Sequence, residues 1–142
     1  MAKQYRAGFV RRLVNKMVSR RVAKGKMEGT YLLTTLGRKS GMERTTPVTL
    51  AVRDGHRYLV SPYGNVGWVY NLRDSAMAEL SRGGNVQEIS VTEVDAATAG
   101  PVLKQYVQDV GVVRSFFDAD KDDPVEAFEA EAAGHPVFRI NI

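Results

Sequence analysis

Two glycine-containing turns divide the middle of the sequence, and they constrain the fold more than any other feature. Asp54-Gly55 separates two apolar and β-branched runs, at residues 45–52 and 57–61. Gly83-Gly84-Asn85 precedes an alternating run at 86–94. Turns of this kind join neighbouring antiparallel strands, because glycine, asparagine and aspartate adopt the positive φ angles that tight hairpins need. The sequence therefore predicts two antiparallel hairpins.

Further strands and a few helices complete the expected elements. The runs at 31–35 and 137–142 are strand-like, and the second turn favours a strand at 76–81, whose own pattern is ambiguous. Pro47 places its strand at a sheet edge or a bulge. The expected helices are a short one around 68–72, one from the N-cap Asp95 to Gly111, and one opened by Asp123-Pro124 and ended by Gly134. Short antiparallel strands with helices outside them predict an α+β barrel or a curled sheet.

Charge is divided unevenly along the 142 residues, a length that suits a single domain. Residues 1–44 hold 12 of the 20 basic residues and only two acids, a net charge of +10. Residues 45–142 hold 8 bases and 14 acids, a net charge of −6. An asymmetry of this kind usually indicates an anionic partner.

The N-terminal segment is both basic and amphipathic. Apolar residues at 5–22 fall on one side of a helix, and residues 1–27 hold nine bases and no acid. Such a helix lies on an anionic membrane surface, or it packs its apolar face on the domain and leaves its bases in water. We expect residues 1–29 to form this helix and a linker, and residues 30–142 to form the strand-rich part of the same domain.

The composition excludes several classes of site. The chain has no cysteine, which removes disulfides, thiol catalysis and cysteine-ligated metals and fits a reducing cytoplasm. His56 and His135 lack acids at metal-ligand spacing, so they are interpreted as turn residues and no metal site is expected. No apolar run approaches the ~20 residues that span a bilayer, and no signal-peptide pattern is expected. Aromatic residues are not interleaved with the bases, so nucleic acid is not an expected partner.

The segment at 37–47 joins two expected strands and combines the groups that bind an anion. Gly37 and Gly41 let backbone N–H groups turn inward. The hydroxyl and basic side chains of the segment are Arg38, Lys39, Ser40, Arg44, Thr45 and Thr46. Since arginine binds oxyanions through paired hydrogen bonds, the segment suits a phosphate or a polycarboxylate, and a solvated hairpin is the alternative. It is not a Walker A loop, because Gly41 follows the Lys-Ser pair instead of preceding it.

The loop at 61–71 gathers aromatic residues beside glycines. Tyr63, Trp68 and Tyr70 offer contact area to a flat ring system, and the glycines permit close backbone approach. Alternatively, Trp68 anchors the loop to the core. A serine-hydrolase site is not supported, because Ser61 has no base near it in sequence and no nucleophile-elbow context.

These two segments resemble one known family. The block YLLTTLGRKSGMERTTPVTL at 31–50, with DGHRYLVSPYG and WVYNL after it, resembles the actinobacterial deazaflavin-dependent nitroreductase and quinone reductase family. The resemblance implies an α+β split β-barrel of the FMN-binding-like type over residues 30–142, with helices packed outside the barrel. It also implies coenzyme F420, a deazaflavin with a phospholactyl-oligoglutamate tail. In this family the reduced coenzyme transfers hydride to quinones, activated alkenes or nitro compounds.

The resemblance also assigns roles to individual residues. The residues expected to hold the phosphate and the start of the glutamate tail are Arg38, Lys39, Ser40, Gly41 and Arg44. Those expected beside the deazaflavin ring or the substrate are Thr46, Pro47, Ser61 and Trp68. The candidate catalytic residues, as proton donors or substrate-orienting groups, are Ser61 and Tyr63.

Two departures from the nitroreductase members bear on the substrate. The loop after Ser61 is shorter and lacks a lysine, and four apolar residues stand where those members have several tyrosines. These four residues are core or cover a pocket mouth: Val112, Val113, Phe116 and Phe117. The departures argue against bulky nitroimidazoles and leave quinones and enones open. The predicted protein is a cytoplasmic F420H2-dependent reductase, monomeric or homodimeric, and the alternatives are a non-catalytic deazaflavin or lipid carrier and an FMN-dependent reductase.

Overall fold

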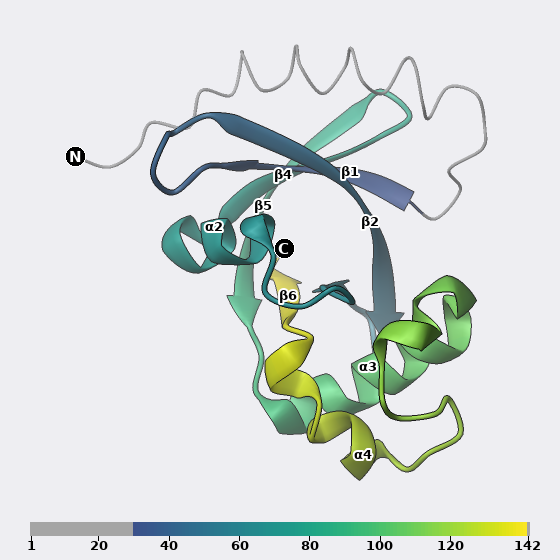
Figure 1. Ribbon diagram of the computed structural model, residues 1–142. Coiled ribbons are helices and arrows are strands. Elements are labelled where there is room, and N and C mark those ends of the chain that lie inside the picture. Colours follow the sequence, from purple (N-terminus) through teal and green to yellow (C-terminus); the bar gives the residue numbers. More distant parts are fainter. Residues whose placement is uncertain (1–29, 142) are drawn as a thin grey trace.

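The computed structural model describes residues 30–141, and within them six antiparallel strands close into a barrel with helices outside it (Figure 1). The elements are β1 (Thr30–Leu36), β2 (Glu43–Arg53), β3 (His56–Val60), α2 (Gly67–Ser75), β4 (Met77–Arg82), β5 (Asn85–Glu93), α3 (Ala96–Asp109), the 3₁₀ helix η2 (Gly111–Phe116), α4 (Val125–Glu129), the 3₁₀ helix η3 (Ala132–Gly134) and β6 (Val137–Asn141). The strand order is β1-β2-β3-β6-β5-β4, and β4 pairs with β1. The predicted α+β barrel is confirmed, while the predicted helix at 5–22 lies outside the described residues.

Both predicted hairpins are present. Asp54 and Gly55, with φ angles of 52° and 79°, join β2 to β3. Gly83 and Gly84, with φ angles of 58° and 85°, join β4 to β5. Two successive residues at positive φ give a turn whose twist matches that of the flanking strands. The segment that is ambiguous by pattern is therefore strand β4, as the neighbouring turn indicates.

Strand β2 changes its partner halfway along its length. Residues 43–49 pair with β1, and residues 50–53 pair with β3. Pro47 lies opposite Leu32 of β1, in the half of β2 whose other edge pairs with no described strand. Because proline has no N–H to give to a ladder, it is tolerated at this free edge, as expected from the sequence. The free edge leaves room for a pocket beside the barrel.

Alternation along β3 separates two cores. Leu59 packs inside the barrel with Phe138 of β6 and apolar residues of the other strands. Tyr58 and Val60 lie in a second cluster with Leu103 and other residues of α3, on the outer side of the strand. Each fully buried leucine or phenylalanine contributes about 1.5–3 kcal/mol through removal of apolar surface from water. The barrel is thus filled from within, and the helices cover part of its outside.

Helices α3 and α4 lie together against one side of the barrel, and α2 lies near the turn that joins β1 to β2 (Figure 1). The predicted N-cap of α3 is confirmed, because the Asp95 carboxylate accepts a hydrogen bond from the Thr98 backbone N–H (2.9 Å). Gly100 lets α4 approach α3 closely, since a Cβ there would lie 3.1 Å from Cγ1 of Val125. None of the helices within residues 30–141 is long and apolar enough to cross a membrane.

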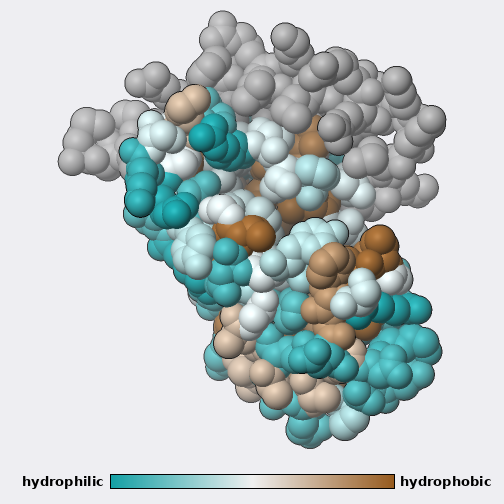
Figure 2. Space-filling view, viewed as in Figure 1, coloured by the Kyte–Doolittle hydropathy of each residue, from teal (hydrophilic) through white to brown (hydrophobic). Residues whose placement is uncertain are grey.

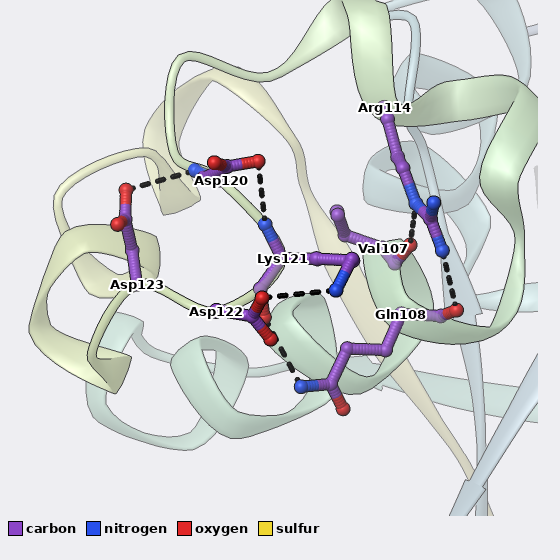
Figure 3. Close-up of polar contacts among 7 residues, drawn as sticks. All are labelled: Val107, Gln108, Arg114, Asp120, Lys121, Asp122 and Asp123. Atoms are coloured by element: carbon purple, nitrogen blue, oxygen red, sulfur yellow. Dashed lines mark hydrogen bonds and ion pairs between the residues drawn. The ribbon is translucent and has the colours of Figure 1, made fainter.

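The predicted start of α4 is wrong by one residue, and the predicted N-cap residue is wrong as well. The Asp123 carboxylate accepts a hydrogen bond from the backbone N–H of Asp120 (2.8 Å), so it closes the preceding turn instead of capping the helix (Figure 3). Pro124 occupies the N-cap position, and α4 ends at Glu129. The 3₁₀ helix η3 then carries the chain to Gly134. Aspartate side chains form hydrogen bonds with free backbone N–H groups in nearby turns as well as at helix starts. Here the Asp123 carboxylate bonds an N–H of the preceding turn.

Candidate functional site

The turn between β1 and β2 is closed by its own backbone. The Gly37 N–H donates to the carbonyl of Met42, and the Gly41 N–H donates to the carbonyl of Gly37, each at 2.8 Å. The Met42 N–H donates to Oγ of Ser40 (3.1 Å). A Cβ on Gly37 would lie 2.7 Å from that Oγ, so a larger residue there would displace the Ser40 hydroxyl group from its bond with Met42. The turn therefore presents Arg38, Lys39 and Ser40 together at the end of the hairpin.

Asn71, on α2, anchors this turn from behind. Its Oδ1 accepts hydrogen bonds from the backbone N–H of Arg38 (3.1 Å) and from Nη1 of the same residue (3.4 Å). Its Nδ2 donates to Oγ1 of Thr35 (3.0 Å), and the side chain is only 3% exposed. The Arg38 guanidinium also lies 5.0 Å from the centre of the Tyr70 ring. The position of Arg38 is thus fixed before any ligand binds.

Sequence reasoning missed Asn71. An asparagine between Tyr70 and Leu72, on the buried side of a short helix, was the available signal. Its partners at Thr35 and Arg38 lie more than thirty residues away in the sequence. Only the fold shows what the amide binds.

A cavity of about 590 Å³ opens in front of the turn. We call it the main cavity, and it is lined by Gly37, Arg38, Lys39, Ser40, Arg44, Thr45, Thr46, Tyr63, Val66, Gly67, Trp68 and Asn71. Three of these residues are cationic, and no carboxylate belongs to the described wall. Lys39 and Arg44 make no ion pair with any residue of 30–141. Uncompensated positive charge at a concave surface attracts an anionic ligand.

A smaller pocket of about 160 Å³, which we call the side pocket, adjoins the main cavity. The two share Thr46, Tyr63 and Trp68 as a common wall. The rest of the side pocket is lined by Thr30, Pro47, Val48, Thr49, Val60, Pro62, Tyr106, Val110, Val112 and Val113. The free edge of β2 and the end of α3 thus enclose a space whose described lining is uncharged, next to a cationic one.

Apolar side chains border these cavities on the side away from the basic turn. Val112 is 76% exposed and Phe116 is 52% exposed, and the Phe116 ring meets Tyr63 edge to face at 4.7 Å. Figure 2 shows hydrophilic residues over the β1–β2 turn and hydrophobic residues over the segment that follows α3. Of the four apolar residues left open between core and pocket mouth, Val113 and Phe117 are core and Val112 and Phe116 are exposed.

Arg114 fixes the segment that carries these apolar residues. Its Nε donates to the carbonyl of Val107 and its Nη2 donates to the carbonyl of Gln108, each at 2.9 Å (Figure 3). Gln108 in turn donates from Nε2 to the carbonyl of Lys121 (3.1 Å). The free carbonyls at the end of α3 are satisfied in this way, and η2 is held against the helix.

The structure brings most of the predicted site residues together. Those in the wall of the main cavity are Arg38, Lys39, Ser40, Arg44, Thr46, Tyr63 and Trp68. Pro47 lines the side pocket, and Gly41 lines neither space but holds the turn at a φ angle of 69°. Ser61 also lines neither, because it is buried and its hydroxyl donates to the carbonyl of Gly64.

His135 is more than the turn residue that the sequence predicted, because its ring contacts two other parts of the structure. Its ring stacks on Phe117, with centroids 3.9 Å apart, and is mostly buried. Its Nδ1 donates to the carbonyl of Pro62 (2.9 Å), and its Nε2 lies 3.6 Å from Oε1 of Glu131. The histidine therefore supports the backbone next to Tyr63. His56 is exposed at the start of β3, and no group of three or more histidines and acids within 30–141 is placed to hold a metal ion.

Solved structures share this fold at low sequence identity. An F420-H2 dependent reductase (FDR-A) is 19% identical, over 80% of this chain and 94% of that one, with a TM-score of 0.54. A protein solved as a domain-swapped dimer is 18% identical, over 96% and 100% of the chains, with a TM-score of 0.57. A FAD-binding protein from Mesorhizobium loti is 16% identical, over 86% and 88%, with a TM-score of 0.51. These likenesses show the flavin and deazaflavin split-barrel fold.

The sequence itself shows more than the fold. No curated protein matches it closely enough to be informative. Residues 7–114, however, match the F420H(2)-dependent quinone reductase family, a segment that includes the basic turn, the aromatic loop and most of η2. The chain therefore belongs to the F420H(2)-dependent quinone reductases, and it is an oxidoreductase whose hydride donor is the reduced form of coenzyme F420.

Proposed function

We propose that the main cavity binds coenzyme F420 with the phosphate and glutamate tail at the basic turn and the deazaflavin ring toward Trp68 and Tyr63. The observation that carries this proposal is a cavity whose described wall has three cations and no carboxylate at one end and aromatic side chains at the other. A tail of a phosphate and several carboxylates matches the cationic end. The aromatic end offers flat apolar area to a ring system. The residues of the cavity therefore fit this coenzyme.

Individual residues of the turn have distinct parts in this binding. Arg38 and Arg44 donate to tail oxyanions, and Lys39 adds a third positive charge. The Ser40 oxygen already accepts from Met42, so its hydroxyl hydrogen remains available to the ligand. Gly41 shapes the turn, and Thr46 lies in the wall shared by both cavities.

The reaction needs little chemistry from the protein. The bound reduced coenzyme supplies a hydride, and a proton completes the conversion of a quinone to a hydroquinone. The protein binds and orients the acceptor and excludes water from it. We propose quinones and small activated alkenes as acceptors, because the exposed border at Val112 and Phe116 is apolar and uncharged. Reduction of nitro compounds, contact of the predicted N-terminal helix with a membrane and assembly into a homodimer stay predictions.

Titration with oxidised coenzyme F420 tests the proposal directly. Trp68 is the only tryptophan of the chain and lines the main cavity, so binding is expected to quench its fluorescence. Turnover of the reduced coenzyme is then followed by its absorbance with menadione, cyclohexenone and a nitroaromatic compound. Binding without oxidation by any acceptor would support a carrier, and preferential binding of FMN would support a flavin enzyme. Absence of coenzyme binding would reject the assignment of the cavity.

We propose that Ser61 holds the loop and does not donate a proton. The variant Ser61→Ala is expected to lower the free energy of unfolding by about 1 kcal/mol, because the loop loses one hydrogen bond while the Gly64 carbonyl keeps the Val66 N–H as a donor. Its kcat is expected to change less than about threefold, whereas loss of a general acid costs about 100-fold or more. Urea denaturation and steady-state kinetics measure the two effects. Ser75→Ala is the control, since that hydroxyl also donates to a carbonyl but lines neither cavity. A large fall in kcat at unchanged stability would restore the catalytic role.

A further inference from the structure

The side pocket has the chemistry of a site for an uncharged ring. Its wall contains five valines and two prolines, and none of the described residues that line it is charged. An apolar protein cavity of about 150 Å³ is large enough to hold a benzene ring, so about 160 Å³ suits one ring of a ligand. Because the pocket shares Thr46, Tyr63 and Trp68 with the main cavity, a ring inside it lies next to whatever the main cavity binds.

One polar group in this wall has no hydrogen-bond partner among the described residues. Tyr106, on α3, is only 5% exposed and lines the side pocket. No residue of 30–141 makes a hydrogen bond with its hydroxyl group. The hydroxyl oxygen is not one of the fully enclosed atoms without a partner, so solvent reaches it. A ligand that fills the pocket excludes this water, and only a ligand with an oxygen that accepts a hydrogen bond then satisfies the phenol, since an unsatisfied hydroxyl group is costly.

We propose that the side pocket binds the carbonyl-bearing ring of the substrate that accepts the hydride. The Tyr106 hydroxyl group then donates a hydrogen bond to the carbonyl oxygen of this substrate. The ligand class is a flat, uncharged compound with a conjugated carbonyl, of which a quinone is the simplest case. This inference rests on the proposed function, because it places the acceptor beside the coenzyme cavity. It assigns Tyr106 to binding and orienting the acceptor and requires no proton transfer from it.

The surroundings of Tyr106 keep it a donor. Burial, and to a smaller degree the neighbouring Tyr63, raise the pKa of Tyr106 to about 12. The phenol therefore stays protonated at neutral and moderately alkaline pH. A neutral donor in an apolar pocket favours an acceptor with a carbonyl oxygen over a hydrocarbon of the same shape, since only the carbonyl satisfies the hydroxyl.

The test compares two ligands that differ in their oxygens. Menadione and 2-methylnaphthalene have the same fused carbon skeleton and methyl group, and equilibrium dialysis measures the binding of either without coenzyme. Quenching of Trp68 fluorescence is a second readout for menadione. The chain has no cysteine, so menadione meets no thiol to react with. The variant Tyr106→Phe is expected to bind menadione about two- to tenfold more weakly than the native protein, the range of one neutral hydrogen bond. Its affinity for 2-methylnaphthalene is expected to be unchanged.

A second tyrosine provides the control. Tyr58 is buried in the same apolar cluster as Tyr106 but lines none of the described cavities, so Tyr58→Phe is expected to leave both ligands unaffected. The proposal is overturned if Tyr106→Phe binds menadione like the native protein, if both ligands weaken equally, or if menadione does not quench Trp68 at all.

Coenzyme titration separates this inference from the proposed function. Tyr106→Phe is expected to bind oxidised coenzyme F420 as the native protein does, because Tyr106 does not line the main cavity. If neither protein binds the coenzyme while menadione still distinguishes them, the proposed function fails and the side pocket stands. If the coenzyme binds and turns over but menadione does not distinguish the two proteins, the side-pocket proposal alone fails.

Discussion

Replacing Arg38 and Arg44 together by alanine is expected to weaken the binding of oxidised coenzyme F420 about 1,000-fold. Both guanidinium groups line the main cavity, and no carboxylate belongs to its described wall. A hydrogen bond to a charged group contributes about 1.5–3 kcal/mol, and two such losses correspond to factors of about 100 to 10,000 in the dissociation constant. Each single variant is expected to lose about 10- to 100-fold.

The fold is expected to survive this change. The turn is closed by backbone hydrogen bonds of Gly37 and Gly41, and an alanine at position 38 keeps the N–H that Asn71 accepts from. Arg53→Ala is the matched control, because Arg53 is a partly exposed arginine that lines neither the main cavity nor the side pocket.

Salt provides an independent check on the arginine variants. Coenzyme affinity of the native protein is expected to fall as ionic strength rises, and that dependence is expected to flatten in the double variant. Titration by Trp68 fluorescence at two salt concentrations measures it. Equal coenzyme affinity in the double variant and the native protein would show that the tail does not bind at this turn.

Asn71→Ala is expected to damage both the fold and the site. The variant removes an amide that bonds Arg38 twice and Thr35 once, at a position that is almost fully buried. The free energy of unfolding is expected to fall by about 2–4 kcal/mol, because buried partners lose their hydrogen bonds. Coenzyme affinity is expected to fall about tenfold, since the freed Arg38 side chain must be ordered again when the tail binds.

Asn71→Asp separates the two effects. An aspartate keeps an oxygen that accepts from Arg38, so stability is expected to fall less than in the alanine variant. Its negative charge lies in the wall of the cavity proposed to bind an anionic tail. Coenzyme affinity is therefore expected to fall further than in the alanine variant. Urea denaturation and fluorescence titration measure both quantities, and Asn65→Ala, an exposed asparagine outside the cavity wall, is the control. If the aspartate variant bound the coenzyme more tightly than the alanine variant, the assignment of an anionic ligand would be wrong.

Features encoded by neighbouring residues were predictable from the sequence. The Asp54-Gly55 and Gly83-Gly84 turns require positive φ angles that their own residue types provide, and both hairpins formed where expected. The Asp95 cap depends on an N–H only three residues away. The basic turn was recognisable for the same reason, because its charges and glycines are contiguous.

Features that depend on distant partners were not predictable. The amide of Asn71 bonds residues more than thirty positions earlier, and the ring of His135 bonds the carbonyl of Pro62 from the far end of the chain. The prediction that Asp123 caps α4 failed for a local reason, because its carboxylate bonds a free N–H in the preceding turn instead. Tyr106 reads as an ordinary core residue of α3, and only the free edge of β2 makes it part of a pocket wall.

The position of β6 in the barrel has a consequence for folding during synthesis. This strand lies between β3 and β5, so residues 137–141 fill a gap between strands that precede them by more than forty positions. A nascent chain that has emerged only as far as α4 leaves the edges of both strands without their partner. Open edges of this kind pair readily with other chains. The barrel therefore closes only after β6 has been synthesised. Until then, the nascent protein is most prone to aggregation.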